Sequence, residues 1–183
     1  MKFSICILFC TINIINSCAQ NVELNAKVNN LRFIKEMPYE PELSGDSLFW
    51  VVIKAKIDIV PYLIQKLTDT TITEAPVPNF GGYYTVADIA CSAISEIIHN
   101  VPILEFAEDS INNEQSNGYW GYWNYTRRSF ENRVKFKNRI YKWYFANITN
   151  FEWVKNNQIL RNSPDWKFQP GKHPSGGFYQ LRK

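Results

Sequence analysis

The chain has 183 residues, a length that predicts one domain large enough to bury a sizeable core. Its formal net charge of +3 is small, so the charge balance gives no general argument for binding to nucleic acid. The composition is that of an ordinary globular protein, except that aromatic residues are abundant at 15%.

A targeting signal is predicted for residues 1–17, because Lys2 precedes an apolar stretch from residue 3 to residue 15. This stretch is too short to span a bilayer as a helix of the mature protein, so a cleaved signal fits it best. Since Cys18 is then either lipidated or removed, Cys91 is the one thiol left, and no internal disulfide can form. Cys91 follows an apolar pattern, which predicts a buried structural thiol.

Two cleavage sites compete at the end of this signal. Residues 15–18, Ile-Asn-Ser-Cys, resemble the box at which bacterial lipoproteins are cleaved, although Asn16 stands where a small or branched residue is usual. On this interpretation Cys18 carries the lipid and anchors the protein in the cell envelope, at the periplasmic face or the cell surface. Alternatively, residues 17–19 match an ordinary signal-peptidase site, which would leave a soluble secreted or periplasmic chain starting at Gln20.

Residues 18–44 are predicted to form a tether and then a docking segment. The polar composition of residues 20–30 fits a tether. Pro38 and Pro41 break any regular element before the main domain begins. Between them and the tether, four apolar residues predict a short element that packs on the domain: Leu31, Phe33, Ile34 and Met37.

Residues 45–148 are predicted to be a helical domain. Asp46 can cap its first helix and Asp58 its second, because carboxylate oxygens accept from the free N–H groups of a first turn. Thr85 and Asp88 have the spacing of a capping box at the start of the third helix. The apolar stripes of the second and third helices are expected to bury four residues against each other: Leu63, Leu67, Ala90 and Ile94.

The pattern Ile-Val-Pro-x-Leu-Ile-x-x-Leu-x-Asp of residues 59–69, followed by Val-x-x-x-Ala-x-x-Ala-Ile-x-x-Ile in residues 86–97, resembles a HEAT repeat. The resemblance implies antiparallel helix pairs and covers about one and a half units between Gly45 and Asn100. It departs from the family at residues 70–84, an insertion in place of a tight turn, and at Ala87, where a basic residue is usual. The alternative is generic helical hairpins. The predicted fold is mainly α, with a HEAT-like antiparallel helical core and a small irregular or β C-terminal tail.

The insertion at residues 70–84 is predicted to be a surface loop, because its prolines and glycines exclude a regular helix. Loops of this length often carry function. Its candidate binding residues are Phe80, Tyr83 and Tyr84, which offer rigid aromatic contact area. The alternative is a structured spacer that lies over the helices.

A second aromatic cluster lies between Tyr119 and Tyr125. If exposed, it would form a platform for sugar rings or peptides, with Trp120 and Trp123 as candidate binding residues. If buried, it would be part of the core, with each polar ring atom paired. The acidic and polar residues 103–117 before it are predicted to form a loop.

The longest helix is predicted over residues 127–146, with its cap at Asn124 or Thr126. Its apolar stripe is expected to include Phe130 and Tyr141. Four basic residues line another side and form either a solvated face or a patch for anionic lipid headgroups: Arg128, Lys135, Arg139 and Lys142.

Residues 149–183 are predicted to be a tail rich in aromatic residues, glycine and proline that packs on the helical domain. Alternation of apolar and polar residues over 151–154 predicts a strand, and residues 178–181 can pair with it. Trp166 and Phe168 are expected to hold the tail on the helices.

No motif in the sequence assigns a catalytic residue, a metal site or a cofactor. Glu96 and His99 share one helix face, but a single Glu-x-x-His is a weak metal signal. The expected function is that of a non-enzymatic envelope lipoprotein that binds another protein or an envelope component, and no nucleic acid. The alternative is a small envelope enzyme that acts on glycan or peptide in an aromatic-lined cleft, since two carboxylates suffice for a glycosidase.

Overall fold

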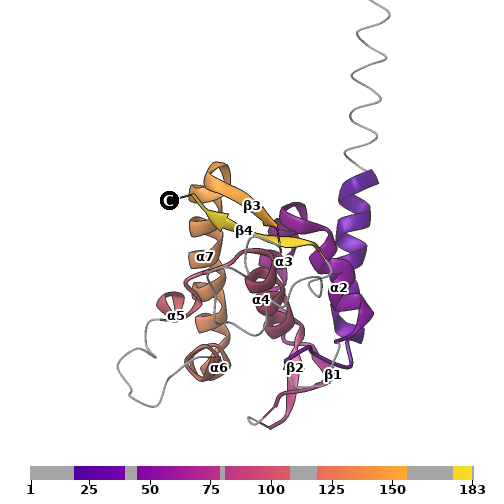
Figure 1. The fold of residues 1–183 in the computed structure, drawn as a ribbon. Coiled ribbons are helices and arrows are strands. Elements are labelled where there is room, and N and C mark those ends of the chain that lie inside the picture. Colours follow the sequence, from indigo (N-terminus) through magenta and orange to yellow (C-terminus); the bar gives the residue numbers. More distant parts are fainter. Residues whose placement is uncertain (1–18, 40–44, 79–80, 108–118, 156–174, 183) are drawn as a thin grey trace, which may run out of the picture.

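The protein is mainly helical and carries two small two-stranded antiparallel sheets, which confirms the predicted fold class (Figure 1). This computed structural model describes residues 19–39, 45–78, 81–107, 119–155 and 175–182. The predicted signal and Cys18 lie outside these ranges. Within them, no helix has both the length and the hydropathy needed to cross a bilayer.

Residues 19–29 form a helix, so the prediction of a polar tether at this position is wrong. Leu24 and Val28 lie four residues apart on one helical face, and both are buried in the core. The polar residues around them occupy the solvent side, which explains why the composition suggested a tether.

The 3-10 helix η1 (Asn30–Phe33) follows. The predicted docking element is confirmed by three buried residues: Leu31, Ile34 and Met37.

Three short elements come next: α2 (Ser47–Lys54), the 3-10 helix η2 (Lys56–Ile59) and α3 (Val60–Lys66). The carboxylate of Asp46 caps α2 as predicted. Asp58 does not cap α3, because it lies inside η2, which runs directly into α3 with no extended residue between them.

Helix α4 (Val86–Ile97) lies at the centre of the fold, with every residue from position 86 to position 94 buried (Figure 1). It begins with the predicted capping box: Thr85 accepts from the backbone N–H of Asp88, and Asp88 accepts from that of Thr85. It packs against α3. The four residues predicted to lie in this contact are all buried: Leu63, Leu67, Ala90 and Ile94.

The segment between α3 and α4 is a β-hairpin of β1 (Ile72–Pro76) and β2 (Tyr83–Thr85), so it is structured, as the alternative to a surface loop predicts. The strand β1 alternates exposed and buried residues, but its buried positions are Thr73 and Ala75. Because these two residues are small or polar, the alternation is invisible to a hydropathy pattern.

The C-terminal half begins with α5 (Ile103–Phe106), a short helix where a loop was predicted. The aromatic cluster forms α6 (Tyr119–Arg128), which is followed by α7 (Phe130–Asn147). The cap of α7 is Ser129, whose side chain accepts from Asn132. The predicted caps, Asn124 and Thr126, lie inside α6.

The face of α7 that is buried in the core is not the face predicted from the sequence. Phe130 and Tyr141 are 63% and 45% exposed. This helix carries aromatic residues on two faces, and the face that packs in the core is the one that also carries an arginine. The buried residues recur at intervals of three and four: Arg133, Phe136, Ile140 and Tyr144.

The tail contains the predicted strand pair. After the 3-10 helix η4 (Ile148–Asn150), β3 (Phe151–Lys155) pairs with β4 (Gly177–Leu181) in antiparallel register. An isolated bridge between Ile98 and Tyr179 connects this sheet to the end of α4. Trp166 and Phe168 lie outside the described residues.

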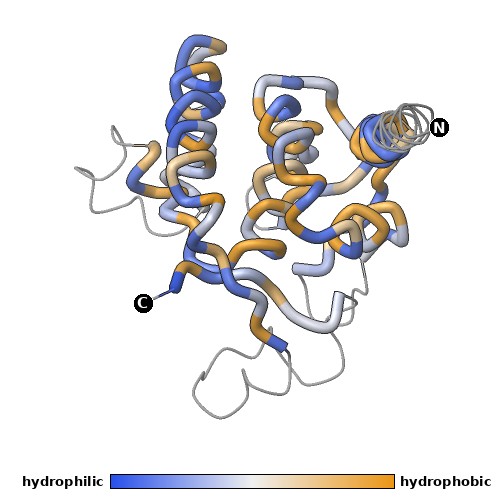
Figure 2. Tube along the Cα trace, turned by 90° about the horizontal axis from the view of Figure 1, so that it is seen from above, coloured by the Kyte–Doolittle hydropathy of each residue, from blue (hydrophilic) through white to orange (hydrophobic). Residues whose placement is uncertain are grey.

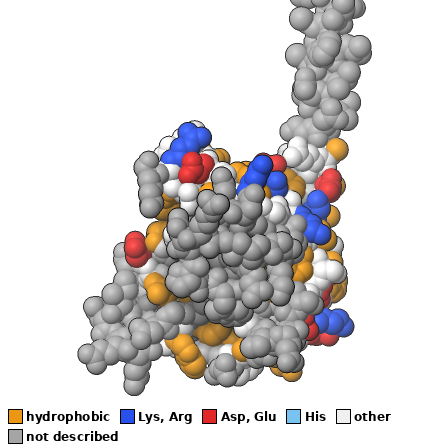
Figure 3. Space-filling model, viewed as in Figure 1, with side chains coloured by type: hydrophobic (Ala, Val, Ile, Leu, Met, Phe, Trp, Pro, Cys, Tyr) orange, Lys and Arg blue, Asp and Glu red, His pale blue; other side chains and the backbone are white. Residues whose placement is uncertain are grey.

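Hydropathy differs between the two sides of the molecule. Hydrophobic positions are more frequent on the side of α2, α3 and α4, and hydrophilic ones on the side of α6 and α7 (Figure 2). On the face drawn in Figure 3, the described charged side chains are of both signs and are scattered. This distribution agrees with the small net charge of the chain.

Candidate binding site

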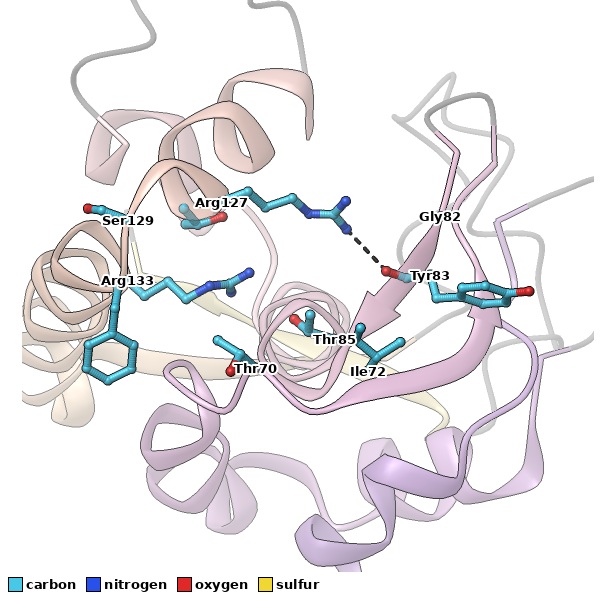
Figure 4. Close-up of a pocket in the computed structure, with 10 residues that line it drawn as sticks. Thr70, Ile72, Gly82, Tyr83, Thr85, Arg127, Ser129 and Arg133 are labelled. Carbon is cyan, nitrogen blue, oxygen red and sulfur yellow. Dashed lines mark hydrogen bonds between the residues drawn. The ribbon is translucent and has the colours of Figure 1, made fainter.

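A cavity of about 450 Å³ opens between the β1–β2 hairpin and the corner where α6 meets α7 (Figure 4). Its volume is within the range of small-ligand sites. We call it the hairpin cavity. The residues that line it are Thr70, Ile72, Gly82, Tyr83, Thr85, Thr126, Arg127, Ser129, Phe130 and Arg133.

Asp88 is the buried anchor beside the cavity and accepts hydrogen bonds from four groups. One carboxylate oxygen accepts from the backbone N–H of Thr85 at 3.0 Å and from the Arg127 guanidinium at 3.3 Å. The other accepts from the hydroxyl of Tyr122 at 3.1 Å and from the Arg133 guanidinium at 3.4 Å. Since these donors come from β2, α6 and α7, one carboxylate joins all three elements to the start of α4.

Arg133 is the most unusual side chain of the cavity, because this charged side chain is only 5% exposed. Figure 4 shows it projecting from α7 into the space below Arg127. Among the described residues, its guanidinium donates to Asp88 alone. A guanidinium carries five N–H donors, so most of the donors of Arg133 have no protein acceptor in this part of the chain.

Arg127 spans the opening of the cavity from α6 to the hairpin. Its guanidinium donates to the backbone carbonyl of Tyr83 at 3.3 Å, besides its contact with Asp88 (Figure 4). The same guanidinium lies over the ring of Trp123 at 5.6 Å. These contacts fix its position at the rim.

Two buried titratable groups that interact with Asp88, Tyr122 and Cys91, are held in their neutral forms. Burial, and then the negative charge of Asp88, raises the pKa of Tyr122 well above its ordinary value. The same two causes raise the pKa of the Cys91 thiol. Tyr122 therefore stays a hydrogen-bond donor, and Cys91 is the inert structural thiol that the sequence predicted.

The rim of the cavity also carries exposed apolar residues. Ile72 and Tyr83 on the hairpin are 69% and 54% exposed, and Phe130 at the start of α7 is 63% exposed. The ring of Tyr83 is turned away from the cavity interior (Figure 4). Large apolar side chains that gather around one opening are a common feature of binding surfaces.

The binding residues predicted from the sequence separate into three groups. Tyr83 lies at the rim, and Trp120 is 46% exposed on α6. Tyr84 and Trp123 are buried and pack edge to face at 6.0 Å; that they contact a partner stays a prediction. Both rings belong to the buried core, as the core alternative predicts for Trp123. Phe80 and Cys18 lie outside the described residues.

Sequence reasoning missed the two arginines and the second role of Asp88. Asp88 was interpreted as a capping residue, which is correct but incomplete. The available signal was Arg133, three residues before Phe136 and therefore on the same helical face. Its partner could be identified only after α4 and α7 were known to lie together.

The Glu96–His99 pair has structural partners. Glu96 accepts from the hydroxyl of Tyr39 at 3.2 Å, and the ring of His99 packs on Phe178 at 4.9 Å. In the described ranges, no three histidine, cysteine, aspartate or glutamate side chains gather in a way that could hold a metal ion.

No protein-family model matches the chain, and comparison with curated proteins and with solved structures gives no match either. The HEAT-like resemblance therefore stays a prediction. The function has to be argued from the cavity itself.

Proposed function

We propose that the protein is a non-enzymatic binding module of the cell envelope, which binds another protein or an envelope component at the hairpin cavity. The observation that carries this proposal is the buried guanidinium of Arg133 within an exposed apolar rim. Arginine and aromatic residues are enriched at the centres of interfaces, where surrounding contacts exclude water.

The rigidity of the site supports this function. The rim residues belong to β1, β2 and α7, and the contacts of Asp88 hold β2 and α7 against α4. A preformed site avoids part of the entropy cost of ordering side chains on association. The cavity is therefore suited to binding without a rearrangement of its walls.

The alternative, an envelope enzyme, has less support at this site. Of the two tryptophans predicted to line a cleft, Trp123 is buried and neither lines the hairpin cavity. Asp88, which pairs with both arginines of the cavity, already accepts from four donors, so its oxygens are poorly placed to exchange protons with a substrate. The arrangement fits recognition better than acid–base chemistry.

The envelope location is part of the same proposal and rests on the signal at residues 1–17 with Cys18 as the lipidated residue. The helix at residues 19–29 packs on the domain through Leu24 and Val28. Leu24 follows Cys18 by six residues, which is roughly 9 Å if the chain between them is helical. A lipid at Cys18 would therefore hold the domain close to the membrane surface.

Capture from native membranes tests this function, with two matched variants of α7. Phe130→Ser alters the rim, and Phe145→Ser alters an equally apolar exposed residue roughly 22 Å along the same helix. Both variants should keep the melting temperature of the wild type, since both side chains are exposed. We expect Phe130→Ser to lose the captured partner and Phe145→Ser to retain it. Equal capture by the two variants would contradict the proposal.

A further inference from the structure

We propose that the hairpin cavity recognises a single carboxylate group with an apolar group beside it. This inference rests on the proposed binding function and specifies its ligand chemistry. Two sources present that chemistry: a small organic acid and the C-terminal residue of a polypeptide. The inference is carried by the donors of Arg133, the charges around it and the apolar walls.

The donors of Arg133 require an acceptor. Its side chain is 5% exposed and lines the cavity. Its one acceptor within the described ranges, Asp88, lies 3.4 Å away, whereas charge-assisted N–H···O contacts are typically about 2.7–2.9 Å. Asp88 therefore satisfies this guanidinium only in part. A second carboxylate in the cavity would supply the missing acceptors, because the planar fork of arginine matches two carboxylate oxygens.

The charges favour a monoanion. The described ionised groups at the cavity are Arg127 and Arg133, which are positive, and Asp88, which is negative. A ligand with one negative charge would leave these groups neutral as a set. A phosphate group carries about −1.5 to −2 at neutral pH and would place the excess negative charge close to buried Asp88. Carboxylate is therefore preferred over phosphate.

The walls beside the arginines accommodate an apolar substituent. Ile72 on β1 and Phe130 on α7 both line the cavity and are mostly exposed, so a ligand can cover them. Thr85 adds a polar contact, since its oxygen accepts from the N–H of Asp88 and its O–H is left to donate. In Figure 4, Ile72 and Thr85 lie side by side beneath the arginines. Ile72 lies across the same cavity from Arg133 and is available to an apolar group of the ligand (Figure 4).

Isothermal titration of the mature chain with three probes tests the inference. N-acetyl-leucine carries the carboxylate and an apolar side chain, N-acetyl-leucinamide lacks the charge, and inorganic phosphate carries a different anion. We expect saturable binding of N-acetyl-leucine, at least tenfold weaker binding of the amide, and no displacement by equimolar phosphate. Equal affinity for acid and amide would overturn the carboxylate assignment, and stronger binding of phosphate would overturn the preference for a monoanion.

Single substitutions test whether the acid binds in the hairpin cavity. Ile72→Ser changes an exposed side chain and should weaken binding of N-acetyl-leucine without weakening that of acetate. Arg127→Gln should weaken binding of both acids, and Arg128→Gln, on the same helix but outside the cavity lining, should weaken neither. If Arg127→Gln does not fold, the Ile72→Ser comparison still decides. Unchanged affinity in Ile72→Ser would show that the acid binds elsewhere and would overturn the inference.

A further titration distinguishes the two sources of the carboxylate, a small organic acid and a polypeptide C-terminus. It uses a short peptide that ends in leucine, as the free acid and as the amide. A peptide acid that binds more tightly than N-acetyl-leucine identifies a polypeptide terminus, and equal affinity identifies a small acid. If neither acid binds while Phe130→Ser still abolishes membrane capture, the carboxylate inference fails and the binding function stands. If capture is also independent of Phe130, both fail.

Discussion

Asp88 is the residue on which the site depends most. Its carboxylate is 1% exposed and faces two guanidiniums, a tyrosine hydroxyl and a backbone N–H. Removal of one partner from a buried ion pair is costly, because the remaining charge stays buried without compensation. The same residue thus supports both the helix start and the cavity.

Asp88→Asn should lower the free energy of unfolding by about 3–5 kcal/mol, because Arg133 would remain buried without its counter-charge. Urea denaturation measures this loss. Asp69→Asn is a suitable control, since Asp69 is partly exposed and its pair with Lys66 is of the kind that contributes about 0.2–1 kcal/mol. A loss of stability in Asp88→Asn as small as that in Asp69→Asn would show that the Asp88 network does not stabilise the fold.

Tyr144 should make stability sensitive to alkaline pH. Burial, with smaller effects from Asp58 and Tyr179, raises the pKa of Tyr144 from 10.0 to about 12. Since the folded state holds the proton more tightly, this contribution to stability is complete below pH 10 and is lost as the pH rises to about 12. The free energy of unfolding, measured across this pH range, should decline more steeply in the wild type than in Tyr144→Phe. Parallel curves would contradict the assignment.

At the residue scale, the sequence predicted what depends on neighbours in the chain. The cap at Asp46 and the capping box of Thr85 and Asp88 were predicted, because both are set within a few residues. The contacts of Asp88 with Arg127 and Arg133 were not, because 39 and 45 residues separate the partners. Such a pair forms only when the fold brings Asp88 within reach of α6 and α7.

At the element scale, the stripe on α3 and the stripe on α4 specify how the core is assembled. Both helices present apolar residues at helical spacing, and the two helices pack together. Leu67 ends α3 and is 1% exposed. Its burial makes it a sensitive reporter of this contact.

Leu67→Ala should destabilise the protein by about 2–5 kcal/mol, through loss of buried surface and the cavity left behind. Denaturant unfolding gives the value. Leu104→Ala is the matched control, because Leu104 on α5 is exposed and should change stability by less than about 0.5 kcal/mol. An equally small loss for Leu67→Ala would place this residue outside the core.

Elements whose patterns were ambiguous were the ones predicted wrongly. Residues 19–29 looked like a tether because a helix that buries one narrow face needs few apolar residues, here Leu24 and Val28. The strands of the hairpin are hard to predict from the sequence, because their buried positions include Thr73 and Ala75. In each case the tertiary contact, and not the local pattern, determines the structure.

At the scale of the whole molecule, the N-terminal helix connects the domain to its proposed anchor. A lipid at Cys18 predicts a mature N-terminus at this residue with added acyl mass, which mass spectrometry of the protein purified from membranes measures. Because the helix at residues 19–29 packs on the core, we expect no long mobile spacer after the lipid. A mature chain that starts at Gln20 without acyl mass would contradict the lipid anchor.

The central claim is that the hairpin cavity is where the protein binds its partner. Site-specific photo-crosslinking in native membranes tests it most directly, with a benzophenone side chain placed at position 83 on the rim or at position 145 on α7. Both positions are exposed, so neither change should disturb the fold. The account predicts one dominant crosslinked product from position 83 and none of that mass from position 145. The same product from position 145, with none from position 83, would contradict it.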